Sequence, residues 1–313
     1  MTSSGIPLVE QYRPKRMDDI VLDPFNRQIL QNIINTAYFP NLLLYGPPGT
    51  GKTTTIINLI NAYQASVGVK NKDLVIHLNA SDERGIDIIR NQINCFVHAK
   101  PLFNNGTKFV ILDEVDYMTK NAQQALRYLL QNYDSQVRFC LICNYISKID
   151  EGLQHEFIRL RFNQLPKEDI VKFLQHITTA EGIPMEESTL MCVQSLYKSD
   201  IRSMINFIQS AQNMTQQTLR IIDRNVWKSL YAQIVDKCPP EMISQTIQDI
   251  SNDYNIDKKN IVKDFLNYLI QQHGEKVTSS MLDFIENLVH VQTSYTNTHI
   301  LYLATKLCST LSS

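Results

Sequence analysis

Glycine is scarce in this sequence, with 10 residues among 313. Hydrophobic residues make up 43% and charged residues 19%, which is ordinary globular usage and excludes a fibre or a low-complexity segment. At about 100 to 200 residues per domain, the length predicts two or three domains. Three of the ten glycines nevertheless lie between Gly46 and Gly51, so any function assigned to the chain has to explain that cluster.

An excess of charge of either sign is also missing. The chain has 30 basic and 31 acidic residues, and its formal net charge is −1. This balance excludes a protein that coats nucleic acid through overall positive charge. Any contact with nucleic acid must therefore be local or shared among several subunits.

Dense cysteine pairing and long hydrophobic runs are absent. The six cysteines are scattered, unlike the disulfide framework of a small secreted domain, which favours a reducing compartment. No stretch approaches 18 uninterrupted apolar residues, and the first ten residues lack the pattern of a secretion signal. We expect an intracellular protein in a reducing compartment, without membrane contact.

The spacing of Cys140 and Cys143 resembles half of a zinc site. On a strand, however, positions i and i+3 face opposite sides, and no second pair of cysteines or histidines follows at ligand spacing. We therefore interpret both cysteines as core residues.

Apolar strands alternate with helical patterns through about residue 162. Strands are predicted at 41–45, 74–78, 109–112 and 137–143, and helices at 53–63, 86–99 and 121–132. This alternation predicts an α/β domain with a parallel, doubly wound sheet and helices on both faces.

After Pro166 the pattern becomes helical. Helices are predicted at 167–180, 186–197 and 201–214, and further helices follow from residue 224. The sequence thus predicts a nucleotide-binding domain over 1–163, a small helical lid over 164–223 and an all-helical domain over 224–313.

The glycine cluster matches the phosphate-binding loop pattern G-x-x-x-x-G-K-[ST]. It lies between a predicted strand and a predicted helix, as the pattern requires. Glycines let the main chain curl so that successive N–H groups point at phosphate oxygens. The residues of the loop are Gly46, Pro47, Pro48, Gly49, Thr50, Gly51, Lys52 and Thr53, with Thr54 next to them. In this pattern Lys52 reaches the β and γ phosphates, and Thr53 offers its hydroxyl to Mg²⁺.

Polar side chains follow two of the predicted strands. Asp113 and Glu114 end the apolar run 109–112, at the edge of the sheet where ligands bind in open α/β folds. Asp113 is placed to hold Mg²⁺, and Glu114 is the candidate to polarise an attacking water. Asn144 ends the strand 137–143, where its amide would contact the γ-phosphate; asparagine at such a position is also a common turn former.

These motifs resemble the AAA+ ATPases, and among them the small subunits of replication factor C, the sliding-clamp loader. The resemblance spans most of the chain, and its C-terminal helical part matches more loosely. It is carried by the segments 9–15 (VEQYRPK), 78–87 (LNASDERGID), 112–119 (LDEVDYMT), 122–127 (AQQALR) and 139–145 (FCLICNY).

The resemblance implies an ATPase that works with ATP and Mg²⁺ inside a hetero-pentameric ring joined by a helical collar. The partners that it implies are the other clamp-loader subunits, a sliding clamp and primer–template DNA. It assigns Lys52 and Thr53 to phosphate and Mg²⁺, Asp113 and Glu114 to Mg²⁺ and water, Asn144 to the first sensor and Arg202 to the second sensor, and it places Tyr12, Arg13 and Val21 at the adenine site. Arg202 also fits a solvent-exposed helix arginine.

DNA contact in the resembled family comes from helices that face the inside of the ring. Arg84 and Arg90 are the candidates in this chain. A few arginines per subunit, repeated around a spiral, would follow a phosphate backbone without making the single chain basic.

One position departs from the family's pattern. Clamp-loader small subunits carry Ser-Arg-Cys after the first sensor, whereas this chain has His155, Glu156 and Phe157 there. The family's arginine reaches the neighbouring subunit's ATP site, and a carboxylate would repel a γ-phosphate. We hypothesise that Glu156 does not complete a neighbour's site and that the subunit sits at the open edge of the ring, unless the nearby Arg159 substitutes.

Two alternatives to an active ATPase subunit stay open at this point. One is a structural subunit that binds ATP without hydrolysing it, which the missing arginine favours. The other is an AAA+ remodeller of protein assemblies, which the segment 81–87 and the helical C-terminal region disfavour.

Overall fold

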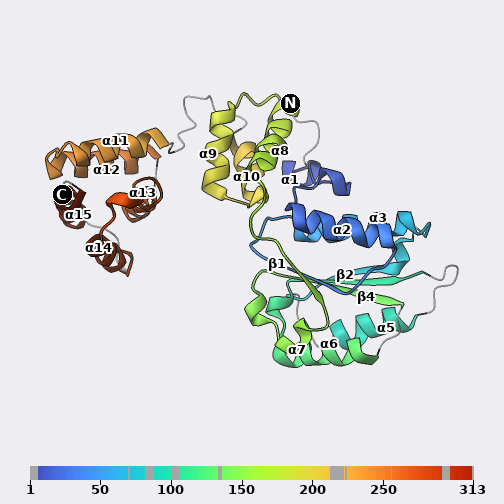
Figure 1. Cartoon of the computed structure of the whole chain (residues 1–313). Coiled ribbons are helices and arrows are strands. Elements are labelled where there is room, and N and C mark those ends of the chain that lie inside the picture. Colours follow the sequence, from blue (N-terminus) through green and yellow to red (C-terminus); the bar gives the residue numbers. More distant parts are fainter. Residues whose placement is uncertain are drawn as a thin grey trace. The chain divides into compact units, whose positions relative to one another are not determined.

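The computed structural model describes residues 6–69, 71–81, 88–99, 106–132, 136–211, 222, 224–254, 256–290 and 297–311. The chain forms two compact units, residues 1–213 and 214–313 (Figure 1). The boundaries predicted at 163/164 and 223/224 remain a prediction, since the nucleotide-binding region and the lid fall within the same unit.

The first unit is built on a five-stranded parallel sheet with the strand order β2-β3-β4-β1-β5. The strands are β1 (Leu42–Tyr45), β2 (Val75–Asn79), β3 (Lys108–Asp113), β4 (Val137–Cys143) and β5 (Ile158–Arg161). The predicted parallel α/β fold is confirmed. Because β1, β3 and β4 are central neighbours, the residues that follow them meet at one edge of the sheet.

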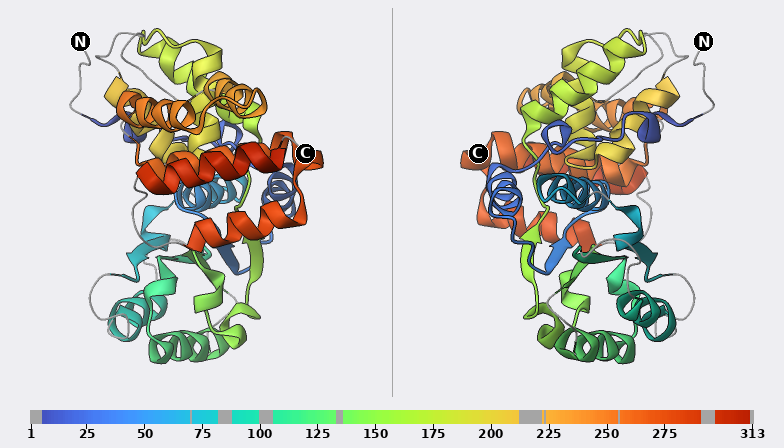
Figure 2. Two further views of the ribbon diagram at one scale, coloured as in Figure 1. Left: turned by 90° about the vertical axis from the view of Figure 1, so that its left-hand side faces the viewer. Right: turned by 90° about the vertical axis from the view of Figure 1, so that its right-hand side faces the viewer.

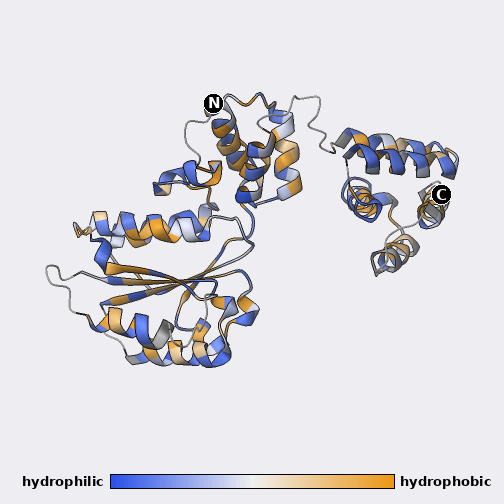
Figure 3. Cartoon of the chain, turned by 180° about the vertical axis from the view of Figure 1, so that it is seen from behind, coloured by the Kyte–Doolittle hydropathy of each residue, from blue (hydrophilic) through white to orange (hydrophobic). Residues whose placement is uncertain are grey.

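Helices cover both faces of the sheet, as Figures 1 and 2 show. One face carries α2 (Pro24–Thr36) and α3 (Lys52–Ser66), and the other carries α5 (Asn94–His98), α6 (Lys120–Asn132) and α7 (Glu151–Gln154). The strands are hydrophobic along most of their length (Figure 3). Alternate residues of a strand therefore enter two separate cores: Leu42 and Leu44 pack toward α3, whereas Leu43 packs toward α6.

The edge strand β5 was not predicted from the sequence. Only Leu160 of its four residues is buried, and the other three are exposed. A four-residue segment with one buried side chain lacks the apolar run that revealed β1, β3 and β4. It is recognised as a strand only because it pairs with β1 in the folded structure.

Three helices follow β5 in the region predicted to form the lid, and the name lid is kept for them: α8 (Lys167–Ala180), α9 (Glu187–Tyr197) and α10 (Ile201–Ser210). The observed α8 has the predicted bounds. The short N-terminal helix α1 (Leu8–Gln11) packs on α10, and the Leu8 amide donates a hydrogen bond to Gln209 Oε1. A segment from the start of the chain therefore completes the lid.

The second unit is helical, as predicted. It contains α11 (Arg224–Val235), α12 (Pro240–Tyr254), α13 (Lys258–Gln272), α14 (Ser279–His290), α15 (Asn297–Leu311) and the 3₁₀ turn η7 (Gly274–Lys276). Its core gathers isoleucine, leucine and phenylalanine side chains at helical spacing, including Ile243, Phe265 and Leu303. Over the described residues, no helix is both long enough and apolar enough to cross a membrane.

Candidate active site

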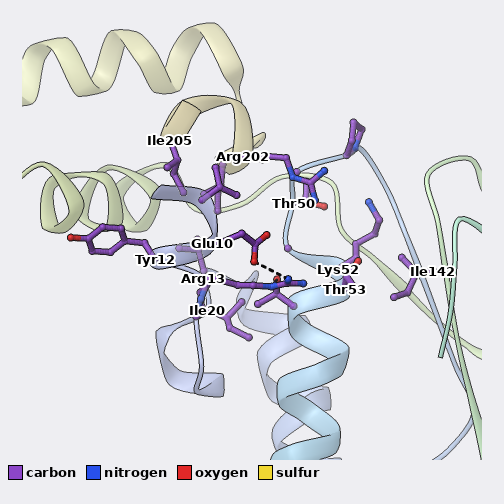
Figure 4. A pocket seen from close by; sticks show the side chains of 18 of the residues that line it. Glu10, Tyr12, Arg13, Ile20, Thr50, Lys52, Thr53, Ile142, Arg202 and Ile205 are labelled. Atoms are coloured by element: carbon purple, nitrogen blue, oxygen red, sulfur yellow. Dashed lines mark hydrogen bonds and ion pairs between the residues drawn. The ribbon is translucent and has the colours of Figure 1, made fainter. Parts of the chain in front are cut away.

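A pocket lies between the carboxyl edge of the sheet, the N-terminal segment and the lid (Figure 4). It brings together most of the residues predicted from the sequence. The predicted residues in its lining are Tyr12, Arg13, Val21, Pro48, Gly49, Thr50, Gly51, Lys52, Thr53, Thr54, Asp113, Glu114, Asn144 and Arg202. Gly46 and Pro47 lie just outside this set and contribute carbonyl oxygens to Lys52.

The loop between β1 and α3 depends on glycine for conformation and for space. Gly49 and Gly51 have φ values of +73° and +83°, in the left-handed region that other residues avoid. A Cβ atom on Gly46 would collide with the backbone of Phe162, and one on Gly49 would collide with the side chain of Asp200. Two of the clustered glycines are therefore required because other parts of the chain approach the loop closely.

Lys52 begins α3, and its side chain is folded back into the loop. Its Nζ donates to the carbonyl oxygens of Gly46 (2.8 Å) and Pro47 (2.7 Å) and to Asn144 Oδ1 (3.1 Å). Burial lowers the pKa of Lys52, and the negative charge of Asp113 offsets part of that shift. The ammonium group thus lies at the helix N-terminus, where phosphate is favoured.

Asp113 is held by three neighbours at the end of β3. Its Oδ2 accepts a hydrogen bond from Thr53 Oγ1 (2.7 Å) and lies 3.8 Å from His77 Nε2, and its Oδ1 accepts from the Glu114 amide (2.9 Å). Burial raises the pKa of Asp113, but these three groups outweigh it, and the net pKa lies below its ordinary value. A hydroxyl and an ionised carboxylate side by side suit Mg²⁺, which prefers oxygen ligands.

Glu114 adopts a left-handed backbone conformation, with φ at +57° and ψ at +39°. Such a conformation is uncommon for a residue with a side chain and is concentrated at functional sites. The hydrogen bond from its amide to Asp113 helps to hold it. The conformation turns the chain sharply after β3, and Glu114 lines the pocket.

The N-terminal segment joins the pocket to the lid. Tyr12 donates its hydroxyl proton to Glu181 Oε1 (2.7 Å), and this bond is the main reason why the pKa of Tyr12 is raised. Arg13 forms an ion pair with Glu10 (Figure 4), and its Nε donates to Thr54 Oγ1. The segment thus contacts both the end of α8 and the start of α3.

The lid meets the phosphate loop directly. The Ile201 amide donates to the Gly49 carbonyl oxygen (3.1 Å), and Asp200 caps α10 by accepting from the Ser203 amide (3.0 Å). Arg202, the next residue of α10, is exposed and lies at the pocket beside Thr50 (Figure 4). Arg202 is therefore both exposed to solvent and located at the pocket, so the two interpretations of this residue from the sequence do not exclude each other.

Sequence reasoning missed part of the lining. The additional residues are Val9, Glu10, Pro14, Asp19, Ile20, Ile142, Phe173, Ile201 and Ile205. Most are apolar, and in sequence an apolar residue at a pocket cannot be told from a core residue. His77 was also missed, although its position on β2 beside β3 would have revealed it once the strand pairing was known.

The structure does not test the two arginines predicted to contact DNA. Arg84 lies outside the described residues. Arg90 belongs to the π-helix η3 (Ile88–Ile93), but its side chain lies outside the described part of the structure.

Glu156 lies at the amino end of the strands, whereas the pocket lies at their carboxyl end. It precedes β5, whose first residue Ile158 pairs with Leu42 at the start of β1, whereas the phosphate loop follows the end of β1. Gln131 donates a hydrogen bond to Glu156 Oε1 at 3.3 Å. Arg159 is exposed on β5 and donates to Gln154. Residue 156 therefore does not face the chain's own pocket.

The two cysteines of β4 are core residues, as predicted. Cys140 packs in the core toward α2 and α3, and Cys143 packs in the core toward α6. Burial raises the pKa of both thiols, that of Cys143 to about 12. Over the described residues, no group of three or more histidine, cysteine, aspartate or glutamate side chains is arranged to hold a metal ion.

The contact between Gly49 and Asp200 generates a prediction. Gly49→Ala should lower the melting temperature more than Gly182→Ala. Both glycines have positive φ, but only the new methyl group at 49 would meet another side chain. Thermal unfolding of both variants measures the difference, with each left-handed alanine costing on the order of 1 kcal/mol or more. Equal melting temperatures for the two variants would contradict a tight contact between loop and lid.

Comparison with known proteins agrees with this geometry. Residues 42–165 match the ATPase family associated with various cellular activities (AAA). Human replication factor C subunit 5 is 40% identical over 236 residues, covering 74% of this chain and 69% of the relative. Replication factor C small subunit 2 of Pyrobaculum islandicum is 35% identical over 240 residues, with 77% and 72% covered.

In fold, the chain is similar to the Holliday junction branch migration motor RuvB of Thermotoga maritima. The TM-score is 0.54 at 13% identity, over 83% of this chain and 91% of the other. This likeness concerns the fold alone. The sequence relatives and the AAA match go further: the chain is an AAA ATPase and belongs to the family of replication factor C subunits.

Proposed function

We propose that this chain binds and hydrolyses ATP as a small subunit of a clamp loader, which places a ring-shaped sliding clamp on primer–template DNA. The observation that carries the proposal is a pair of hydrogen bonds between neighbouring residues of the phosphate loop and the ends of two strands: Lys52 donates to Asn144, and Thr53 donates to Asp113. Three segments far apart in sequence converge there, at the end of a glycine loop and the start of a helix.

Each residue has a role in this proposal. The loop amides and Lys52 bind the β and γ phosphates, and Thr53 and Asp113 hold Mg²⁺. When bound, Mg²⁺ neutralises charge on the phosphate oxygens. Glu114 orients and polarises the water that attacks the γ-phosphorus, while Asn144 and Arg202 contact the γ-phosphate from two sides. Tyr12, Arg13 and Val21 enclose the adenine.

The proposed assembly is a hetero-pentameric ring in which residues 224–313 form the collar and residues 164–223 form the lid of each subunit. Membership in the replication factor C family supports several different subunits in one complex. The proposed further partners are the clamp and primer–template DNA, and the proposed location is the nucleus of a eukaryotic cell or otherwise the cytoplasm.

Glu114→Gln is the experiment that tests hydrolysis. The amide keeps the shape of the side chain but cannot accept a proton from water, so the turnover of ATP should fall by about 10²- to 10⁴-fold. Binding of a fluorescent ATP analogue should stay within a few-fold of the unchanged protein. Turnover is measured in the complex with its partner subunits, clamp and primer–template DNA. Glu151→Gln is the matched control, since Glu151 is an exposed carboxylate at the start of α7.

An unchanged turnover in the Glu114→Gln complex would favour the alternative, a subunit that binds ATP without hydrolysing it. A turnover that neither DNA nor clamp stimulates would contradict the clamp-loader assignment and favour a remodeller of protein assemblies.

Arg84 and Arg90 are proposed to contact the DNA backbone. Arg84→Ala or Arg90→Ala should weaken DNA binding similarly for all sequences and reduce the slope of log K against log salt by about one unit each. Fluorescence anisotropy of the assembled complex at several salt concentrations measures that slope. Arg16→Ala is the control, since Arg16 is exposed and pairs with Asp18. An unchanged slope would remove the arginine from the proposed DNA contact.

Glu156 is proposed to face no neighbouring nucleotide. Glu156→Arg in the complex should leave ATP turnover within about twofold, whereas an arginine that reached a nucleotide would raise it by on the order of 10³-fold. Glu156→Ala separates the new arginine from the loss of the carboxylate. A large increase with arginine but not with alanine would show that position 156 faces a bound nucleotide and would reject an open edge of the ring.

A further inference from the structure

Asp116 is a buried carboxylate for which the proposed mechanism has no role. It lies two residues after Glu114, in the 3₁₀ turn η4 (Val115–Tyr117), and is 5% exposed. Its Oδ1 is the one buried side-chain nitrogen or oxygen without a hydrogen-bond partner in the part of the chain that the structure describes. A buried oxygen without a partner lowers stability, which makes Asp116 a candidate for a role other than folding.

The second oxygen of Asp116 joins two strand ends. Its Oδ2 accepts a hydrogen bond from the backbone amide of Tyr145 at 3.3 Å. Tyr145 follows Asn144 directly, and Asp116 belongs to the turn that follows Glu114. The bond therefore connects the turn after β3 with the turn after β4.

Other contacts hold the same two turns together. The Lys148 ammonium lies 5.3 Å from the ring centre of Tyr117 and 5.0 Å from that of Tyr145. Gln123 Nε2 donates to the carbonyl oxygens of Met118 and Lys148. Asp116 differs from these neighbours because its side chain accepts a hydrogen bond from the backbone amide next to Asn144.

The charge of Asp116 also acts toward the phosphate loop. It raises the pKa of Lys52, against the larger effect of burial, and thus favours the charged ammonium. Burial raises the pKa of Cys143, and the same carboxylate raises it further. The charge of Asp116 thus supports the ammonium form of Lys52, which donates a hydrogen bond to Asn144.

We infer that Asp116 is a positioning residue for ATP hydrolysis, which fixes the Tyr145 amide and thereby holds the Asn144 side chain against Lys52. The inference rests on the proposed function, because it assigns Asp116 to the same site. It predicts that Asp116 affects the rate of the chemical step through Asn144 and not the binding of nucleotide.

The experiment is a double-mutant cycle in the assembled complex with clamp and DNA. Asp116→Ala should lower kcat by about tenfold, because a displaced sensor side chain misplaces the reacting groups, with KM within about twofold. In an Asn144→Ala background, the same change should lower kcat by less than about twofold, since residues that act as a unit are not additive. Asp116→Asn, which keeps an acceptor for the Tyr145 amide, should restore kcat to within about threefold of the unchanged protein.

The matched control is Asp150→Ala. Asp150 also bonds a backbone amide, that of Leu153 at 3.2 Å, but in helix α7 and away from Asn144. It should lower the melting temperature as an N-cap loss does and leave kcat unchanged.

Several results would overturn the inference. Equal losses of kcat from Asp116→Ala with and without Asn144 would show that Asp116 does not act through Asn144. A lower melting temperature with unchanged kcat would reduce its role to folding. If Asp116→Ala does not fold, a kcat of Asp116→Asn that falls tenfold still rejects the inference. A complex whose turnover does not depend on Glu114 would instead refute the proposed function, which is a separate outcome.

Discussion

The site depends on the buried ammonium group of Lys52. Its three hydrogen bonds join the loop after β1 to the residue after β4, so the central strands are tied together where the pocket opens. Withdrawal from water costs this charge free energy, which the carbonyl oxygens and the neighbouring carboxylates offset. Phosphate groups placed at the helix N-terminus would offer the same cation stronger partners, so nucleotide binding exchanges one set of contacts for another.

A second constraint is the direct contact between the phosphate loop and helix α10 of the lid. The Ile201 amide bonds to the Gly49 carbonyl oxygen, and Asp200 occupies the space beside the same glycine. From the other side, Tyr12 bonds to Glu181 at the end of α8, while Arg13 bonds to Thr54 in α3. The lid thus bonds directly to the phosphate loop, and the N-terminal segment connects the lid to α3.

Most of the site could be predicted from the sequence because its signals are local. The glycine loop, the acidic pair after β3 and Asn144 each follow an apolar run, and the parallel sheet brings the three together. What the sequence did not reveal depends on pairing between distant segments: β5 with one buried residue, His77 beside Asp113, and the hydrogen bond from Tyr12 to Glu181. The unpaired oxygen of Asp116 belongs to the same group, since burial is a property of packing and not of residue type.

The direction of the strands separates the pocket from residue 156. The pocket follows the carboxyl end of β1, whereas Glu156 precedes the strand that pairs with it and lies at the amino end. In a ring, one end of a subunit's sheet would serve its own nucleotide, and the other end would be presented to the next molecule. Residue 156 therefore does not act on the chain's own nucleotide, so the proposal that it faces no neighbouring nucleotide can be tested only in the assembled ring and not in the isolated chain.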